Sequence, residues 1–369
     1  MRWPTLIYAI ALTSIAYGQE HQPLNAIELQ YNKNKLVSHE IGGGRFGDQL
    51  LGYIHAKWIS YYYGIPLLCS PFLYSDQLVL HKEELQAEGN TAHLLKHLKA
   101  YSTRDVKVTV QGPDGAPQNY DPDYFHIIQT SRGMDVNYNS KEKELYWISY
   151  FPLSDKENSE DSEWAYFPID WDDAGFKKEL NRLIKPLYLS PTLSLPKDRL
   201  SIALHVRRGG GFDRIDASRV CPTKFPPQSY YIEQVRKISQ LFPEKPLYIF
   251  VFTDDPNPLE LVHEYKQCLS DLDIQFACRE TNNHHASNVL EDFFEMMRFD
   301  CLVAADSNYS GIPAKMIDYK VSIIPRDFQR IGDLIYINQV QVKVGSADIE
   351  DPILERNKII YNEGSNERS

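Results

Sequence analysis

The chain has few cysteines, and they are widely scattered. Five occur among 369 residues, and no two form a CxxC pair: Cys69, Cys221, Cys268, Cys278 and Cys301. This number and spacing exclude a disulfide scaffold and a zinc knuckle. The sequence is compatible with a Cys268–Cys278 bridge in an oxidising compartment but does not decide it. Cys69 and Cys301 lie in apolar runs, so we expect both to be buried as small hydrophobic side chains.

Positive charge is scarce as well. Lys and Arg number 39 against 50 Asp and Glu, which gives a net charge of −11. A broad basic surface for nucleic acid is therefore excluded, and we expect no nucleic-acid partner. An acidic chain that binds an anion must gather its arginines locally, so the Arg207-Arg208 pair stands out. The length and the 43% apolar content favour a globular protein of two domains over one large domain.

Long hydrophobic runs are absent after the amino terminus. Arg2, the apolar run 6–15 and the small residues at Ala16 and Gly18 predict a signal peptide over residues 1–18. We therefore expect a secreted, periplasmic or secretory-pathway protein, with no stable membrane span after cleavage. An uncleaved amino-terminal anchor is the alternative, although a span needs about 20 apolar residues.

No DxD motif is set between strand residues in a way that suits Mg²⁺ on a nucleotide. Asp254 and Asp255 are adjacent rather than spaced. Adjacent side chains in an extended segment point to opposite sides, so these two are not expected to grip one ion. The sequence predicts that no metal is needed.

From residue 200 onward, strands and helices alternate. The pattern predicts strands at 200–205, 247–252, 274–276 and 301–305, and helices at 229–241, 258–269 and 289–298. Such alternation is typical of a parallel sheet covered on both faces. Three strands end in polar loops, at 205–210, 253–255 and 306–310. Parallel strands put their carboxyl ends together, so these loops should meet at one edge.

The upstream part is less regular. A glycine-rich loop at 41–49 is followed by helical spacing over 50–62 and an apolar strand at 67–69. A glycine loop at a helix amino terminus can bind an anion; the alternative is a tight turn needed only for packing. Residues 19–38 read as a polar lead-in. Helical stretches are expected within 78–98 and at 173–187, strands at 106–110 and 146–151, and a linker at 190–197.

The loop after residue 204 carries the strongest chemical signal. An apolar strand runs directly into His205, Arg207, Arg208 and Gly209. Arginine offers a planar fork of donors that binds phosphate in a bidentate manner, and glycine lets the backbone approach closely. The pattern indicates a nucleotide-diphosphate site. The alternative is a basic turn whose arginines pair with surface carboxylates.

Three motifs in order resemble one enzyme family. The segment 43–49 (GGRFGDQ) resembles the glycine-rich opening of α-1,2-fucosyltransferases and, more distantly, protein O-fucosyltransferases. The segment 205–209 (HVRRG) resembles their HxRRGD motif, and 292–310 resembles their third motif. The resemblance implies an α/β fold of the GT-B type, with two Rossmann-like domains facing across a cleft. Domains are then expected at 19–195 (acceptor side) and 196–345 (nucleotide sugar), followed by a tail at 346–369.

The resemblance also implies an inverting, metal-independent fucosyltransferase. Its donor substrate would be GDP-fucose, with no further cofactor, and its acceptor a glycan or glycoprotein. Carried over by position, Arg207 would hold the β-phosphate, and Glu40 or Asp48 would be the catalytic base. Their other interpretations are an exposed acid and a helix-capping Asp. The remaining substrate-binding candidates are Gly43, Gly44, Arg45, Phe46, Gly47, His205, Arg208, Gly209, Asp254, Asp255, Asp292, Ser307, Asn308, Tyr309 and Ser310.

Two positions depart from the family pattern. Asp48 stands where the family usually has Asn, and Gly210 stands where it has Asp. Two alternatives therefore stay open: a GT-B enzyme that uses another nucleotide sugar, and a catalytically inactive, secreted carbohydrate-binding relative. Trp147, Trp164 and Trp171 are candidates for sugar stacking or for core packing. The sequon at Asn308 falls inside the expected site, so we expect it to be unmodified.

Overall fold

The computed structural model describes residues 34–41, 44–87, 89–96, 105–108, 110–111, 123–130, 141–148, 169–188, 192–209 and 221–343. The predicted signal peptide, the carboxy-terminal tail and the predictions for Gly43, Trp164 and Gly210 lie outside these ranges. No helix within them combines the length and the apolar character that crossing a bilayer requires.

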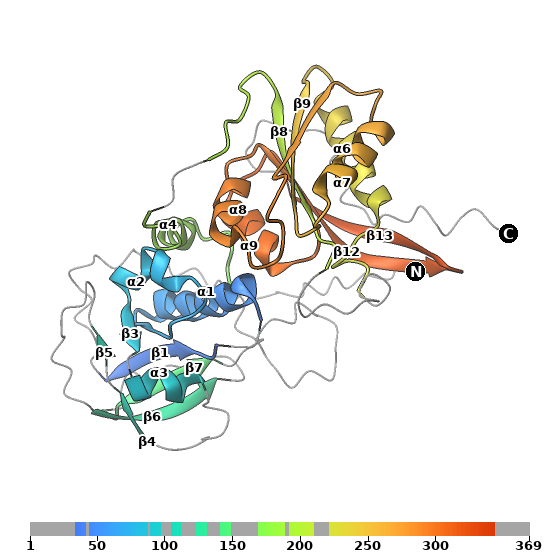
Figure 1. The fold of residues 1–369 in the computed structure, drawn as a ribbon. Helices are drawn as coiled ribbons and strands as arrows, with labels where there is room; N and C mark the ends of the chain where they lie inside the picture. The colour runs from blue at the N-terminus through green and yellow to red at the C-terminus, as the bar shows by residue number, and fades with distance from the viewer. Residues whose placement is uncertain are drawn as a thin grey trace, which may run out of the picture.

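A six-stranded sheet forms the carboxy-terminal unit (Figure 1). Its order is β10-β9-β8-β11-β12-β13, and every neighbouring pair is parallel except β12–β13. The strands are β8 (Leu200–Val206), β9 (Leu247–Thr253), β10 (Ile274–Cys278), β11 (Cys301–Ala304), β12 (Val321–Ile331) and β13 (Leu334–Lys343). The α/β class and the parallel arrangement expected from the sequence are confirmed.

Helices cover both faces of this sheet, as the apolar runs predict. Side chains alternate along β8, so Ile202 packs with helices α6 (Gln228–Leu241) and α7 (Pro258–Cys268). Ala203 points the other way and packs with residues of α8 (Val289–Met296) and α9 (Asn308–Met316). A strand buried on both faces needs the continuous apolar sequence seen from Leu200 to Leu204.

A smaller four-stranded sheet forms the amino-terminal unit (Figure 1). Its order is β1-β7-β6-β4, with β1, β7 and β6 parallel and β4 antiparallel. The strands are β1 (Lys35–His39), β4 (Asp105–Val108), β6 (Asp123–Thr130) and β7 (Glu144–Ile148). A third sheet joins β2 (Leu68–Cys69), β3 (Leu85–Ala87) and β5 (Val110–Gln111). Short helices follow η1 (Ser75–Gln77): α2 (Leu80–Glu83) and α3 (Gly89–Lys96).

Two expectations for this unit are wrong. Residues 35–38 are not a polar lead-in, because β1 is buried along its whole length. Lys35 is tolerated there because its Nζ lies 2.5 Å from Glu144 Oε2 and 3.0 Å from the carbonyl of Glu142. The helical reading of 78–98 also misses β3, which separates α2 from α3. Short apolar runs do not distinguish a strand from a helix by spacing alone.

Helix α1 (Phe46–Tyr63) belongs to a core shared by both units. Its buried face shares one hydrophobic cluster with Val37 and Ile148 of the four-stranded sheet. The same cluster also holds Phe176, Phe293 and Ile312. Figure 1 shows α1 between the four-stranded sheet and helices α4 (Ala174–Leu183), α8 and α9. The amino terminus of α1 is therefore held by elements far away in the sequence.

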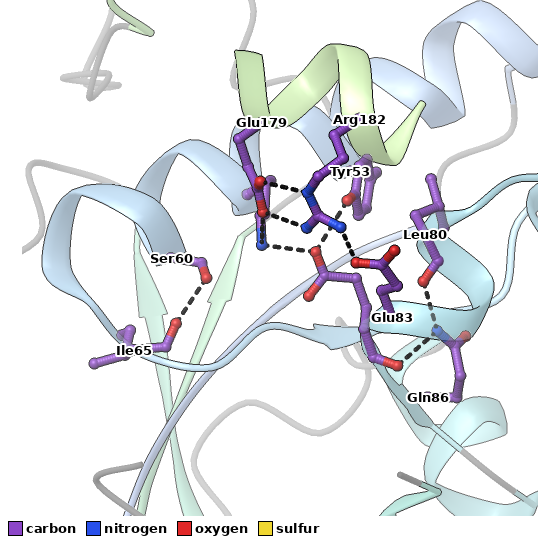
Figure 2. Close-up of polar contacts among 10 residues, drawn as sticks. Tyr53, Ser60, Ile65, Leu80, Glu83, Gln86, Glu179 and Arg182 are labelled. Carbon is purple, nitrogen blue, oxygen red and sulfur yellow. Dashed lines mark hydrogen bonds and ion pairs between the residues drawn. The ribbon is translucent and has the colours of Figure 1, made fainter. Parts of the chain in front are cut away.

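A polar network on the other flank of α1 ties it to α2 and α4 (Figure 2). Buried Glu84 accepts a hydrogen bond from Tyr53 Oη (3.1 Å), and it forms an ion pair with Lys57 Nζ (2.7 Å). Arg182 of α4 bonds Glu179 on its own helix and Glu83 of α2. The groups in this network are bonded to one another, which is typical of a structural cluster.

The segment between the units is held by one buried carboxylate. Glu295 Oε1 accepts from the backbone N–H of Thr192 (2.5 Å) and Leu193 (3.0 Å), and from Thr192 Oγ1 (3.2 Å). Arg298 donates to Glu295 and to the carbonyl of Leu193 (3.0 Å). Burial raises the pKa of Glu295, but these donors outweigh it and hold the pKa below its usual value. Residues 192 and 193 of the predicted linker are thus fixed to α8.

Candidate active site

Three neighbouring strands end at the same edge, as the sequence predicts. In the sheet, β8 lies between β9 and β11, and all three run parallel. His205, near the end of β8, is paired with Phe252 on one side and Ala304 on the other. The loops after residues 206, 253 and 304 therefore leave the sheet side by side.

One of these segments is not a loop. The sequence reading takes 306–310 as an irregular turn, whereas α9 begins at Asn308. Ser307 is the helix N-cap, and its Oγ accepts from the N–H of Tyr309 at 3.3 Å. Asn308, Tyr309 and Ser310 are thus the first turn of a helix whose amino terminus points out of the sheet edge.

His205 is buried against this turn. Its Nδ1 lies 2.8 Å from Ser310 Oγ, and its ring centroid is 5.6 Å from that of Tyr309. Burial, together with the nearby charge of Arg45, lowers the pKa of His205 to about 4. The imidazole is therefore neutral at pH 7, with one donor and one acceptor nitrogen.

The glycine loop meets the same helical turn from the other side. A Cβ added to Gly47 would lie 2.6 Å from the backbone nitrogen of Tyr309 and 2.8 Å from its Cα. Only glycine allows α1 and α9 to approach so closely at this point. Asn308 Nδ2 also donates to Asp48 Oδ1 at 2.7 Å. The predicted Gly47, Asp48 and Asn308–Ser310 are brought together although they are about 260 residues apart.

Asp48 has a clear structural task. It is the third residue of α1, and its Oδ2 accepts from the backbone N–H of Arg45 at 3.2 Å in a capping box. Since Oδ1 binds Asn308, both oxygens of the carboxylate are engaged. These contacts agree with the helix-capping interpretation of Asp48.

The two arginines of the basic loop differ. The Arg207 guanidinium carbon lies 5.0 Å from the centre of the Phe225 ring, a cation–π contact that orients the side chain. Arg208 is tied to β9, because its N–H donates to Asp254 Oδ1 (2.7 Å) and its Nε lies 3.6 Å from Asp255 Oδ2. Asp254 therefore contacts the backbone of Arg208, and Asp255 contacts its side chain. Gly209 follows with φ of 99°, a conformation that glycine adopts readily.

Asp292 lies on α8, where it is bonded to Arg279. It is in the first turn of α8, and Arg279 donates to its Oδ1 at 2.7 Å. Burial raises the pKa of Asp292 to about 6 even though Arg279 opposes this shift. Tyr309 Oη donates to the carbonyl of Val289 on the same helix at 2.6 Å. The bond from Tyr309 ties the turn that carries Asn308 and Ser310 to α8.

The other predicted residues have varied surroundings. Gly44 accepts from Gln49 Nε2 at 2.9 Å, and Phe46 is core, packed edge-on against Phe293. Glu40 follows β1, is partly exposed and donates its N–H to the carbonyl of Ile148 at 2.8 Å.

Trp147 is core, so sugar stacking on it is excluded, whereas Trp171 is partly exposed. All five cysteines are free thiols, and Cys69 and Cys301 are buried as expected.

Some contact residues carry no sequence signal. Phe225 stacks on Arg207, and the carbonyl of Thr223 accepts from the N–H of Asp306 at 2.9 Å. Both depend on how the chain returns to the sheet after residue 220, which spacing does not reveal. Gln49 belongs to the first motif and also accepts from the N–H of Leu73 (2.8 Å). Within the described ranges, no three His, Cys, Asp or Glu side chains gather in a way that could hold a metal ion.

The chain is similar to solved structures at low sequence identity. No family model and no curated protein matches it. Among solved structures it is similar to a mutant of FUT1 from Arabidopsis thaliana in complex with GDP, at 12% identity and a TM-score of 0.46, over 83% of this chain and 73% of that one. It is also similar to POFUT1 in complex with GDP-fucose (14%, TM-score 0.44, 78% and 96%) and to the fucosyltransferase NodZ from Bradyrhizobium (12%, TM-score 0.42, 85% and 99%). At these TM-scores, we draw no functional conclusion from the likenesses.

Proposed function

We propose that this protein is an inverting fucosyltransferase that moves fucose from GDP-fucose to a hydroxyl group of a glycan or glycoprotein. One observation carries the proposal. The three motifs that resemble the fucosyltransferase family are far apart in the sequence, yet their residues meet where α1 and α9 begin. The contacts between Gly47 and Tyr309, between Asp48 and Asn308, and between His205 and Ser310 define that meeting point.

The chemistry of the site supports this choice. Cleavage of the sugar–phosphate bond leaves growing negative charge on GDP, which fixed cationic donors stabilise in the transition state. His205 is neutral at pH 7 because its pKa is about 4, so it can position a group but adds no charge. Arg207 keeps its charge at any relevant pH. We assign charge stabilisation to Arg207 and positioning to His205 and Ser310.

Glu40 and Asp48 are the two candidates for the catalytic base. A base must reach the acceptor hydroxyl directly or through one water. The bonds from Arg45 and Asn308 to Asp48 favour Glu40, which is partly exposed at the end of β1. A Glu40→Gln variant should lose transfer and keep GDP binding if Glu40 is the base.

Replacement of Arg207 tests the proposal. Arg207→Ala should lower the rate of GDP-fucose cleavage by about 100- to 1,000-fold, since one such donor contributes roughly 3–4 kcal/mol to the transition state. Arg207→Lys should fall in between, because it keeps the charge but loses the planar fork. Arg236→Ala is a matched control, since Arg236 pairs with Asp271 on the surface of the same unit. Wild-type rates in Arg207→Ala would contradict the assignment.

Metal independence is part of the proposal. The cationic side chain takes the place that a divalent ion holds in metal-dependent transferases. Activity should therefore persist when the protein is assayed in excess EDTA, and its loss, with recovery on adding Mg²⁺ or Mn²⁺, would overturn this point.

We also propose that the protein enters the secretory pathway or is exported. The amino-terminal pattern supports this, because a short positive region precedes an apolar run and small residues. Mass spectrometry of the protein from its natural source should find Gln19 as the first residue.

A further inference from the structure

A pocket of about 450 Å³ lies beside α9, and neither His205 nor Arg207 lines it. One wall is the face of α9 that carries Asn308, Gly311 and Lys315. A second wall is the segment 169–172, which leads into α4. Its volume falls in the range of small-molecule sites.

The floor of the pocket is one face of the β12–β13 pair. Ser322, Ile324 and Arg326 line it, and residues two apart on a strand point to the same side. Their partners follow the same register, since Lys343 pairs with Ser322 and Gln341 with Ile324. Arg326 also donates to Gln341. The floor is therefore built on paired strands, and Arg326 lies at a β-bulge that follows Pro325.

A glycine marks the side of the pocket formed by α9. Gly311 lies inside the helix, where glycine is a poor helix former compared with alanine. A Cβ added there would meet no atom within 4 Å. Packing does not require glycine at this position, in contrast to Gly47. A bare helix backbone beside an open space leaves room for a bound molecule to approach.

The charges around the pocket indicate the class of ligand. The lining holds three carboxylates and three cationic groups: Asp170, Asp172, Asp306, Lys315, Arg326 and Lys343. Because they balance, the lining favours neither an anion nor a cation. Amides and hydroxyls complete it, and Lys315 lies over the ring of Trp171 at 5.2 Å. Such a mixture of donors and acceptors around a partly apolar wall suits hydroxyl groups, each of which both donates and accepts.

We propose that this pocket binds a neutral pyranose unit of the acceptor glycan. The inference rests on the proposed function, and it places the acceptor next to the donor. Asn308 lines the pocket, whereas Ser310, in the same first turn of α9, contacts His205 on the other side of the helix. A sugar seated in the pocket and a GDP bound beside His205 would therefore share the amino-terminal turn of α9.

A size series at Gly311 tests this proposal in the full-length protein saturated with GDP. The probes are the methyl β-pyranosides of galactose, glucose, xylose and N-acetylglucosamine, followed by saturation-transfer NMR and titration. We expect at least one probe to bind the wild type. Gly311→Ala should weaken it less than about threefold and Gly311→Leu more than tenfold. Neither variant should change the Kd for GDP more than twofold.

The outcomes separate the two proposals. Wild-type affinity for the probe in Gly311→Leu, or no binding of any probe to the wild type, would overturn the acceptor pocket and leave the donor assignment intact. A large loss of GDP affinity in Gly311→Leu would assign the pocket to the donor instead. Absence of GDP binding in the wild type would overturn the proposed function. Binding of a probe that Gly311→Leu abolishes would then still support a sugar site.

Discussion

His205 illustrates how burial sets the chemistry of a single residue. It is about 9% exposed, it contacts Ser310, and its pKa is lowered from 6.5 to about 4. His39 at the end of β1 is only about 1% exposed, and burial lowers its pKa to about 4 as well. Both rings are thus neutral in the folded protein over the range in which a histidine of the unfolded chain gains a proton.

These two histidines predict how stability depends on pH. Between pH 6.5 and 4 the unfolded chain binds more protons than the folded one, so the free energy of unfolding falls as the pH is lowered. Each group should contribute about 2 kcal/mol of this loss between pH 7 and pH 5, since one pKa unit corresponds to about 1.4 kcal/mol. Urea unfolding at several pH values measures the effect.

His205→Asn is the matched variant for this measurement. Asparagine keeps a polar atom near the Nδ1 position but does not titrate. The contribution from position 205 should disappear, and that from His39 should stay. An unchanged pH profile in His205→Asn would show that the pKa of His205 is not lowered in the native state.

At the scale of elements, the contact between α1 and α9 depends on one missing side chain. Gly47→Ala would force its Cβ to 2.6 Å from the Tyr309 backbone, which cannot move aside as a side chain can. Overpacking of this kind costs about 1–3 kcal/mol, and it should also disturb the bond between Asp48 and Asn308. We expect both a lower unfolding midpoint and weaker GDP binding.

Gly52→Ala serves as the control in the same helix. The nearest atoms to its added Cβ are 3.7 Å away, which is ordinary contact. Alanine is the better helix former by roughly 0.5–1 kcal/mol, so this variant should be as stable as the wild type or more so. Equal behaviour of the two variants would rule out the close approach as the cause.

The element that joins the units depends on Glu295. Replacing Glu295 by Gln removes the charge that accepts from Thr192, Leu193 and Arg298. A buried bond network weakened in this way should cost about 1–3 kcal/mol. Glu291→Gln, on the same helix, should stay within about 0.5 kcal/mol of the wild type. Chemical denaturation compares them, and equal stability would show that the linker is held by other contacts.

At the scale of the whole molecule, the carboxy-terminal unit could be predicted well from the sequence. Its strands are buried on both faces, so apolar runs such as 247–252 mark them with little ambiguity. The meeting of three strand ends at one edge followed from their parallel order. The hairpin of β12 and β13 was not predicted, because its outer half, residues 326–331 and 334–336, is exposed or half-buried, and 326–331 carries no apolar run.

The amino-terminal unit was harder to predict because some of its residues depart from the usual pattern of apolar residues inside and polar residues outside. The charged Lys35 makes the sequence of β1 resemble a polar segment. Its burial is explained only by the ion pair with Glu144, more than 100 residues away. The site shows the same limit. The resemblance of the motifs to a known family indicated Asp48, Asn308 and Ser310. The pairing of Asp48 with Asn308 and the stacking of Phe225 on Arg207 are tertiary contacts that no local pattern encodes.

A crystal structure of the protein with bound GDP is the most direct test of this account. It should place the diphosphate within hydrogen-bond distance of the Arg207 guanidinium, beside the first turn of α9 and the start of α1. Diphosphate bound elsewhere, with position 207 turned away from it, would contradict the assignment of this crevice as the donor site.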